Sequence, residues 1–313
     1  MAAHDPAGPD PHGEGDIAAT LVRRGEPTKT DHAVLAVHGY TDYFFNAALA
    51  DHFAERGFAF YALDMHKCGR SWRAGQTPHF ATDLADYDRE LDSALAVIRA
   101  QSGPPTVLVY GHSTGGLIVS LWLDRLRRRG ATAQAGIGGL VLNSPWLDLH
   151  GSPVLRWAVT SVLIAAVARL HGKGVAAPRR GRIRRQLASG LPRRVRLQPA
   201  VETPGGFPIT FGWLHAVRRG QARLHRGLDV GVPNLILRSD HSVAENADQT
   251  TLQCGDAVLD VAQIARWAGC IGNRTNIVPV KDAKHDVFLS MPGRGKSPIA
   301  NSTPGWTPTS APR

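Results

Sequence analysis

The fold of this chain is decided by one stretch, Val107-Leu108-Val109-Tyr110-Gly111-His112-Ser113-Thr114-Gly115-Gly116. An apolar, β-branched run ends in Gly-x-Ser-x-Gly, and a helical pattern follows at once. Side chains at positions 111 and 115 would collide with neighbouring backbone in the sharp strand-to-helix turn that this order predicts. The turn would lift the Ser113 hydroxyl above the sheet edge. It would also aim the backbone N–H of Thr114 at the point where an oxyanion can form.

Strand and helix patterns alternate on both sides of this turn. We expect strands over 17–22, 33–37, 58–63, 106–110, 137–143, 234–238 and 275–280, and helices over 47–56, 84–100, 115–129 and 258–268. Apolar strands that alternate with amphipathic helices predict an α/β fold with a mostly parallel, doubly wound sheet. The alternation stops between Pro145 and Asp229, so the sequence also predicts a lid region inserted into the sheet domain.

Composition divides the chain into five segments. Residues 1–16 are rich in Pro, Gly, Asp and His and are predicted to be a disordered leader. The first part of the core covers 17–144, the lid 145–229 and the second part of the core 230–290. Five prolines in 291–313 oppose a terminal amphipathic helix, so we expect an irregular tail.

The net charge of +10 comes from one part of the lid. Ten Lys or Arg and no Asp or Glu lie within 169–201, while the other 280 residues carry equal numbers of acidic and basic side chains. This distribution excludes a uniformly basic protein that coats nucleic acid. No aromatic residue interleaves with the arginines of 172–201, so a nucleic-acid partner is not predicted.

Three interpretations of the basic segment stay open. The simplest is a disordered loop on the lid, and the second is peripheral contact with an anionic membrane surface. The third is out-of-frame translation of both 172–201 and the tail, because both are rich in Arg, Pro, Gly and Ala and lack a folding pattern.

The three cysteines, Cys68, Cys254 and Cys270, have no CxxC spacing. This predicts neither a disulfide framework nor a zinc cluster, and it fits a reducing, cytoplasmic location. The longest apolar run, 157–170, is too short and too interrupted to span a bilayer. No metal-binding pattern such as HExxH occurs.

A serine nucleophile needs a base, and the base needs an acid that orients it. With this kind of turn the chain order is Ser, then Asp or Glu, then His. His285 follows the last predicted strand, which puts it on a loop at the same sheet edge as Ser113. Two acids fit the order: Asp240, two residues after a strand, and Asp256, directly before a helix. The residues alone leave both open.

The loop after the strand 33–37 is expected to supply a second oxyanion donor. Gly39 lets the backbone approach the site, and the N–H of Tyr40 would then point at the oxyanion. We interpret His38 as a structural hydrogen-bonding residue and not as the base.

Several of these motifs together resemble the α/β-hydrolase superfamily. They are His38-Gly39-Tyr40, Gly57-Phe58-Ala59-Phe60-Tyr61-Ala62-Leu63-Asp64, Cys68-Gly69-Arg70-Ser71, Gly111-His112-Ser113-Thr114-Gly115-Gly116 and Asn143-Ser144-Pro145. The chain is most similar to the monoacylglycerol lipase/lysophospholipase and serine-aminopeptidase-like branch. In that branch the acid stands as Asp-x-[Val/Leu]-x-[Asp/Pro] before a helix, which Asp256-Ala257-Val258-Leu259-Asp260 matches better than Asp240-His241-Ser242-Val243. The resemblance therefore implies a triad of Ser113, Asp256 and His285.

The resemblance also implies an activity. It is hydrolysis of carboxylic esters of acylglycerol or lysophospholipid type, through an acyl-enzyme on Ser113 and without a metal or organic cofactor. Two alternatives remain: a serine aminopeptidase or amidase on the same fold, and a catalytically impaired binding protein.

The apolar residues of the lid allow two interpretations. They form an acyl pocket for a small-molecule ester, or they pack the lid on the core. The residues are Trp146, Leu147, Leu149, Trp157, Leu163, Ile164, Phe207, Phe211 and Trp213.

Overall fold

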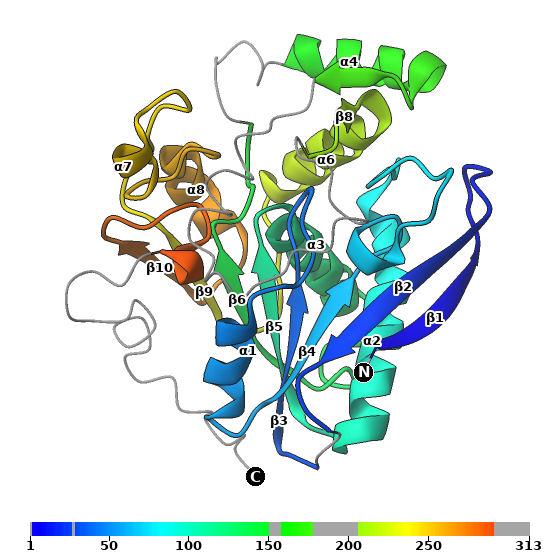
Figure 1. The fold of residues 1–313 in the computed structure, drawn as a ribbon, viewed down its shortest axis with the longest axis vertical. Helices are drawn as coiled ribbons and strands as arrows, with labels where there is room; N and C mark the ends of the chain where they lie inside the picture. The colour runs from blue at the N-terminus through cyan, green and yellow to red at the C-terminus, as the bar shows by residue number, and fades with distance from the viewer. Residues whose placement is uncertain (1, 27–28, 150–157, 178–205, 291–313) are drawn as a thin grey trace.

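The computed structural model describes residues 2–26, 29–149, 158–177 and 206–290. Their main feature is an eight-stranded sheet in the order β1-β2-β4-β3-β5-β6-β9-β10 (Figure 1). The strands of this sheet are β1 (Ala2–Pro9), β2 (Asp16–Arg23), β3 (His32–Val37), β4 (Ala59–Asp64), β5 (Thr106–His112), β6 (Ile137–Asn143), β9 (Asn234–Ser239) and β10 (Thr275–Val280). From β4 to β10 all neighbours are parallel, and β2 is antiparallel to both β1 and β4. The predicted fold class, a mostly parallel α/β sheet, is confirmed.

Helices cover both faces of the sheet, because its strands are apolar on both sides. In β3, Leu35 and Val37 belong to the apolar cluster that includes helices α2, α3 and α8, while Val34 and Ala36 belong to the cluster that includes α1. The helices of the core are α1 (Ala47–Ala54), α2 (Asp88–Ser102), α3 (Thr114–Arg128), α7 (Gln249–Leu252) and α8 (Val261–Trp267), with short 3₁₀ turns η1 (Gly69–Ser71), η2 (Leu84–Tyr87), η4 (Ala268–Cys270) and η5 (Val287–Leu289). Helix α8 starts later than predicted because the Asp260 carboxylate caps it, accepting from the N–H of Ala262.

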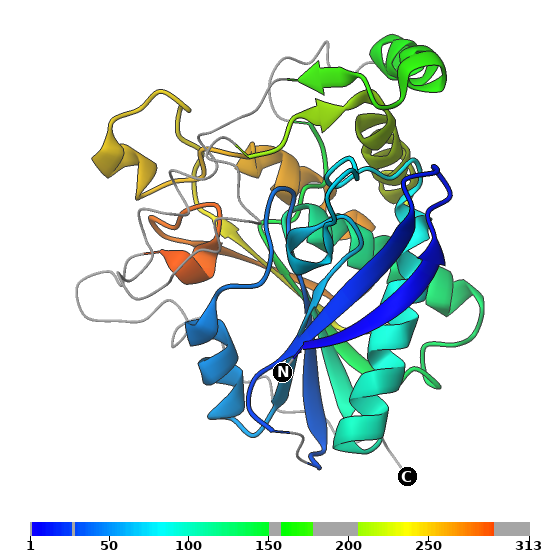
Figure 2. The same ribbon diagram turned by 45° about the vertical axis from the view of Figure 1, so that its right-hand side comes forward.

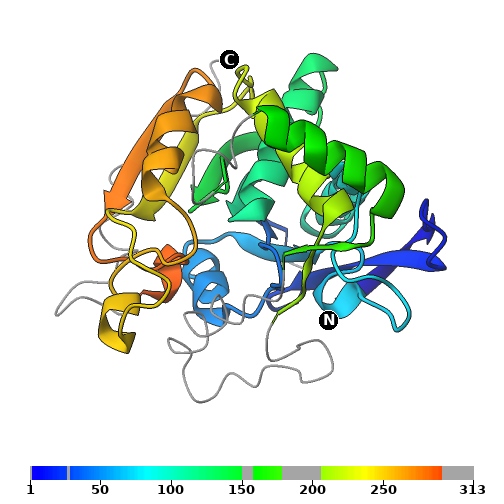
Figure 3. The ribbon, with the colours of Figure 1, turned by 90° about the horizontal axis from the view of Figure 1, so that it is seen from above.

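The lid is more regular than predicted. It contains α4 (Ala158–His171), β7 (Val175–Ala177), β8 (Ile209–Thr210) and α6 (Phe211–Leu224), and β7 pairs with β8 antiparallel. Seen from above, α4 and α6 lie side by side over the core (Figure 3). Strand β7 corrects our expectation that the basic segment 172–201 lacks a folding pattern throughout. The remainder of the basic segment, 178–205, and the tail, 291–313, lie outside the described residues.

The prediction of a disordered leader was wrong. Strand β1 pairs with β2 from Ala2↔Val22 to Pro9↔Asp16 and forms an antiparallel hairpin at one edge of the sheet (Figure 2). The low apolar content of this segment suggested disorder, but backbone pairing to a sheet edge does not require apolar side chains.

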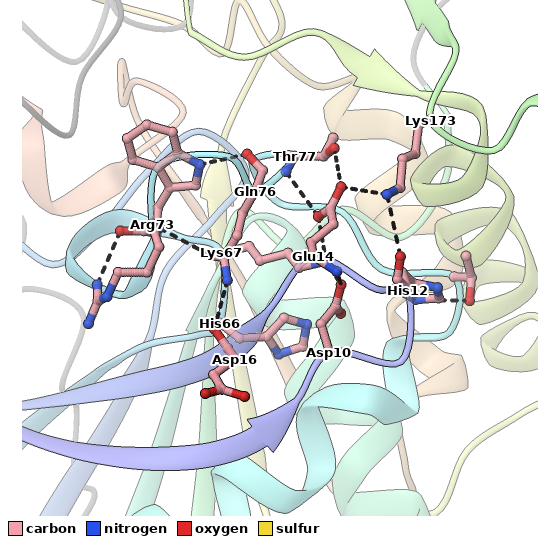
Figure 4. Close-up of polar contacts among 12 residues, drawn as sticks. Asp10, His12, Glu14, Asp16, His66, Lys67, Arg73, Gln76, Thr77 and Lys173 are labelled. Atoms are coloured by element: carbon pink, nitrogen blue, oxygen red, sulfur yellow. Dashed lines mark hydrogen bonds and ion pairs between the residues drawn. The ribbon is translucent and has the colours of Figure 1, made fainter.

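The hairpin loop also supplies the partners of a buried lysine. Lys67 is fully buried, and its Nζ lies 2.9 Å from Asp10 Oδ2 and 2.8 Å from Glu14 Oε2 (Figure 4). Glu14 Oε1 also lies 2.7 Å from Nζ of Lys173, in the turn between α4 and β7 of the lid, and accepts from the Thr77 hydroxyl. Two carboxylates from the hairpin thus neutralise a lysine of the core and a lysine of the lid.

No helix among the described residues is long and apolar enough to cross a membrane.

Candidate active site

Ser113 occupies a strained turn between the last residue of β5 and the first residue of α3. Its φ is 53° and its ψ is −118°, a conformation that non-glycine residues rarely adopt. A Cβ on Gly115 would lie 2.3 Å from the carbonyl oxygen of His38, and one on Gly111 would lie 2.7 Å from Cα of Gly116. The predicted steric need for glycine on both sides of the serine is confirmed.

Backbone hydrogen bonds hold this turn in place. The N–H of Ser113 donates to the carbonyl of Asn143 at the end of β6, at 3.0 Å. The carbonyl of Ser113 accepts from the N–H of Trp146, also at 3.0 Å. The turn is therefore fixed to the neighbouring strand and to the first residues of the lid.

His285 and Asp256 form a buried pair near the carboxyl edge of the sheet. Nδ1 of His285 lies 3.0 Å from Oδ2 of Asp256, and the two side chains are 3% and 0% exposed. Oδ1 of Asp256 accepts from the N–H groups of Val258 and Leu259, each at 2.8 Å. These bonds hold the carboxylate while its other oxygen faces the imidazole.

The environment keeps Asp256 ionised. Burial alone would raise the pKa of its carboxyl, but the charge of His285, the hydrogen bond to it and the two backbone N–H donors outweigh this and lower the pKa. An ionised Asp256 favours the tautomer of His285 that carries its proton on Nδ1, so that Nε2 is free to accept a proton.

The other candidate acid, Asp240, lies elsewhere. Its Oδ1 is 2.7 Å from Nδ1 of His241 and accepts from the N–H of Asp282 at 3.1 Å. These three exposed residues hold side-chain atoms within 4.8 Å of one another. The structure therefore brings Asp256, and not Asp240, to His285.

The loop after β3 approaches the nucleophile as expected. A Cβ on Gly39 would lie 3.0 Å from Cβ of Ser113. Tyr40 is anchored through its hydroxyl, which donates to the carbonyl of Pro208, and through its ring, 4.0 Å from that of Trp213. The N–H of Thr114 is the first of α3, where helix geometry leaves the donor without an intrahelical acceptor. Tyr40 and Thr114 thus flank Ser113 from two sides.

His38 is bonded to backbone on both ring nitrogens. Nδ1 lies 2.8 Å from the carbonyl oxygen of Gly39, and Nε2 accepts from the N–H of Met65 at 3.3 Å. This arrangement fits the structural role that we expected for it.

A mostly apolar cavity of about 230 Å³ opens at Ser113. Its lining includes Ser113, Thr114, Tyr40 and His285, together with apolar residues of the lid and the second half of the core. These apolar residues are Trp146, Leu149, Ile164, Ala176, Ala177, Ile209, Leu214, Val258 and Leu259.

The apolar lid residues divide between the cavity and the core. Trp146, Leu149 and Ile164 line the cavity, whereas Leu147 and Trp213 are buried in the main core. Leu163 is 61% exposed, and Trp157 lies outside the described residues.

Sequence reasoning missed a second ionisable pair at the cavity. Nδ1 of His112 lies 3.5 Å from Oδ2 of Asp42, and both residues line the cavity. Burial would lower the pKa of His112, but the hydrogen bond to Asp42 and the charges of Asp286, Asp42 and Asp256 raise it. The ring of His112 is 5.0 Å from that of His285. No spacing rule joins residues 42 and 112, so only the position of His112 inside Gly-x-Ser-x-Gly could have drawn attention to it.

Solved structures with a similar fold include hydrolases of several kinds. A soluble variant of monoglyceride lipase from Saccharomyces cerevisiae, in complex with a substrate analogue, has a TM-score of 0.60 at 14% identity over 87% of this chain and 85% of that one. A thermostable carboxyl esterase from Bacillus coagulans, in complex with glycerol, has a TM-score of 0.54 at 15% identity over 89% and 90%. A thioesterase domain from the curacin biosynthetic pathway has a TM-score of 0.52 at 15% identity over 91% and 94%.

A search of curated protein sequences finds no match. A family model does match, over residues 28–254, and this range contains the Ser113 turn, the lid and most of the sheet. The chain therefore belongs to the serine aminopeptidase S33 family of α/β hydrolases.

Proposed function

We propose that this protein is a serine hydrolase that cleaves carboxylic esters through an acyl-enzyme on Ser113. The observation that carries the proposal is the convergence of three features on one cavity. These are the strained turn at Ser113, the oriented Asp256–His285 pair and an apolar lining. A nucleophile, an oriented base and a binding pocket are the parts that acyl transfer requires.

The chemistry follows from the roles of these groups. Nε2 of His285 takes the hydroxyl proton of Ser113 while Oγ attacks the ester carbonyl, and Asp256 stabilises the imidazolium that forms. The N–H groups of Tyr40 and Thr114 donate to the oxyanion. The imidazolium then gives its proton to the departing alcohol. Water, deprotonated by His285, next attacks the acyl-enzyme and releases the carboxylic acid.

The lining favours an acyl group of low polarity. Nine of the sixteen lining residues are apolar side chains from the lid and from 258–259. The lid encloses the cavity from the side of β7 and β8 and would cover an acyl chain that is bound to Ser113. An acylglycerol or a lysophospholipid-like ester fits this character.

An amide or aminopeptidase substrate is the second candidate, and one observation supports it. Asp42 is the only carboxylate among the described residues that line the cavity, and a substrate amine could pair with it. Asp42 already faces His112, however, so its charge is partly engaged. We therefore rank the ester first.

Labelling with a fluorophosphonate probe tests the proposal. The wild-type chain should be labelled on Ser113 and should hydrolyse p-nitrophenyl esters. Ser113→Ala should lose both properties, with turnover lowered by a factor on the order of 10⁴ or more. Ser120→Ala is the matched control, because Ser120 lies two turns further along α3 and its hydroxyl donates to the carbonyl of Gly116.

The outcomes separate the candidate functions. An unlabelled wild-type chain would favour a binding protein and would end the proposal. If labelling occurs, a panel of acyl esters and aminoacyl p-nitroanilides ranks ester against amide hydrolysis.

A further inference from the structure

His285 must reach Ser113 across the sheet. Ser113 follows β5, whereas His285 follows β10, and strands β6 and β9 lie between them. Parallel neighbours are about 4.8 Å apart, so the two chain segments start about 14 Å from one another. The loop that carries His285 therefore needs an attachment near Ser113.

Asn143, the last residue of β6, provides such an attachment. Its side-chain Nδ2 donates to Oδ1 of Asp286 at 2.7 Å, and its Oδ1 accepts from the N–H of Val287 at 3.1 Å. Asn143 is fully buried. These two bonds hold the residues that directly follow His285.

The backbone of the same residue holds the nucleophile. The carbonyl of Asn143 accepts from the N–H of Ser113, and Asn143 stands opposite His112 in the β5–β6 register. One residue thus fixes the turn that carries Ser113 and, through its side chain, the loop that carries His285.

We propose that Asn143 is a positioning residue, which sets the distance between Ser113 and His285 through its bonds to Asp286 and Val287. The inference rests on the proposed function. The amide is suited to this task because it donates to a carboxylate and accepts from an N–H at the same time, which neither an aspartate nor an aliphatic residue can do. The Asp256 bond orients the ring of His285, whereas the Asn143 bonds place its backbone.

Asn143→Ala should lower kcat by a factor on the order of 10², because a displacement of about 1 Å between reacting groups has that effect. KM should change less than about threefold, because Asn143 does not line the cavity. Rates are measured per folded enzyme, with the folded fraction taken from thermal unfolding and the competent fraction from burst titration.

Three further variants separate positioning from stability. Tyr110→Phe removes the other acceptor of Asn143 Nδ2, at 2.8 Å in the same buried network, but leaves the His285 loop attached. It should lower Tm with kcat near wild type. Asp286→Asn retains an oxygen that can accept from Asn143 and from the N–H of Phe288, so it should keep kcat within a few-fold, whereas Asp286→Ala should behave like Asn143→Ala.

An unchanged kcat in folded Asn143→Ala, or an equal loss of kcat in Tyr110→Phe, would overturn the inference. The proposed function would survive either result, because it is tested by the labelling of wild-type Ser113.

Discussion

Two buried ionic groups in this molecule look alike but have different surroundings. The first group is the pair of Asp256 and His285. The second group consists of Lys67 with Asp10 and Glu14. Every side chain in both groups is less than 9% exposed. His285 opens onto the cavity at Ser113. Nζ of Lys67 instead faces Asp10 and Glu14 of the hairpin loop (Figure 4).

The difference teaches that burial of an ion pair does not by itself reveal a function. Removing one partner from a buried ion pair is costly when it leaves the other partner buried with an uncompensated charge, whether or not the pair does chemistry. What distinguishes the first pair is its access to a cavity and its neighbour in a strained backbone conformation, Ser113. We therefore expect the first pair to control turnover and the second to control stability.

Asp256→Asn should have the largest effect. Loss of the carboxylate removes the preference for the tautomer of His285 that can act as base, and kcat should fall about 10³–10⁴-fold. Tm should change little, because the amide oxygen can still accept from the N–H groups of Val258 and Leu259. Ester hydrolysis measures kcat, and differential scanning calorimetry measures Tm.

The control is Asp260→Asn, since asparagine also caps helices well. An equal loss of kcat in Asp260→Asn would show that the Asp256–His285 pair does not specifically control turnover.

Lys67→Met should have the opposite profile. It leaves the buried carboxylate of Asp10 without its cationic partner and leaves Glu14 with Lys173 alone, so it should destabilise the protein by about 3–5 kcal/mol. The kcat of the folded fraction should stay at the wild-type value. Urea unfolding followed by circular dichroism gives the free energy of unfolding.

Lys173→Met is the matched control. The side chain of Lys173 is 47% exposed, and its loss should lower the free energy of unfolding by about 0–1 kcal/mol. A fall in kcat of folded Lys67→Met would show that the two groups are not independent.

Glu14→Gln should give the smallest effect, and one that depends on pH. Burial would raise the pKa of Glu14, but Lys173, Lys67 and Thr77 outweigh it and lower the pKa from 4.5 to about 2. A carboxyl with a lowered pKa in the folded state stabilises the protein above its unfolded pKa, and this contribution is lost as the pH falls from about 4.5 to 2. The variant should therefore be less stable than wild type at pH 7 by about 1–3 kcal/mol. Unfolding free energies at pH 7, 5, 4 and 3 should converge on acidification. A difference that stays constant with pH would argue against an ionised Glu14.

Local patterns predicted much of the sheet. Strand 137–143 coincides with β6, and helix 115–129 differs from α3 by one residue at each end. These elements succeed because apolar periodicity and the Gly-x-Ser-x-Gly turn depend on neighbours within a few residues. The hairpin of β1 failed as a prediction because its first strand carries no apolar alternation, and because the buried lysine that pairs with Asp10, Lys67, lies far from it in the chain.

The sequence by itself determined the turn at Ser113, since the steric demands on Gly111 and Gly115 follow from the order strand, glycine, serine, glycine, helix. It also narrowed the acid to two residues, and the family resemblance favoured Asp256. Only the tertiary structure shows the contact between Asp256 and His285, joins Asn143 to Asp286 and gives Lys67 its partners. Hydrogen bonds and ion pairs form between atoms about 3 Å apart in space, and no rule of local spacing specifies which distant residues will meet.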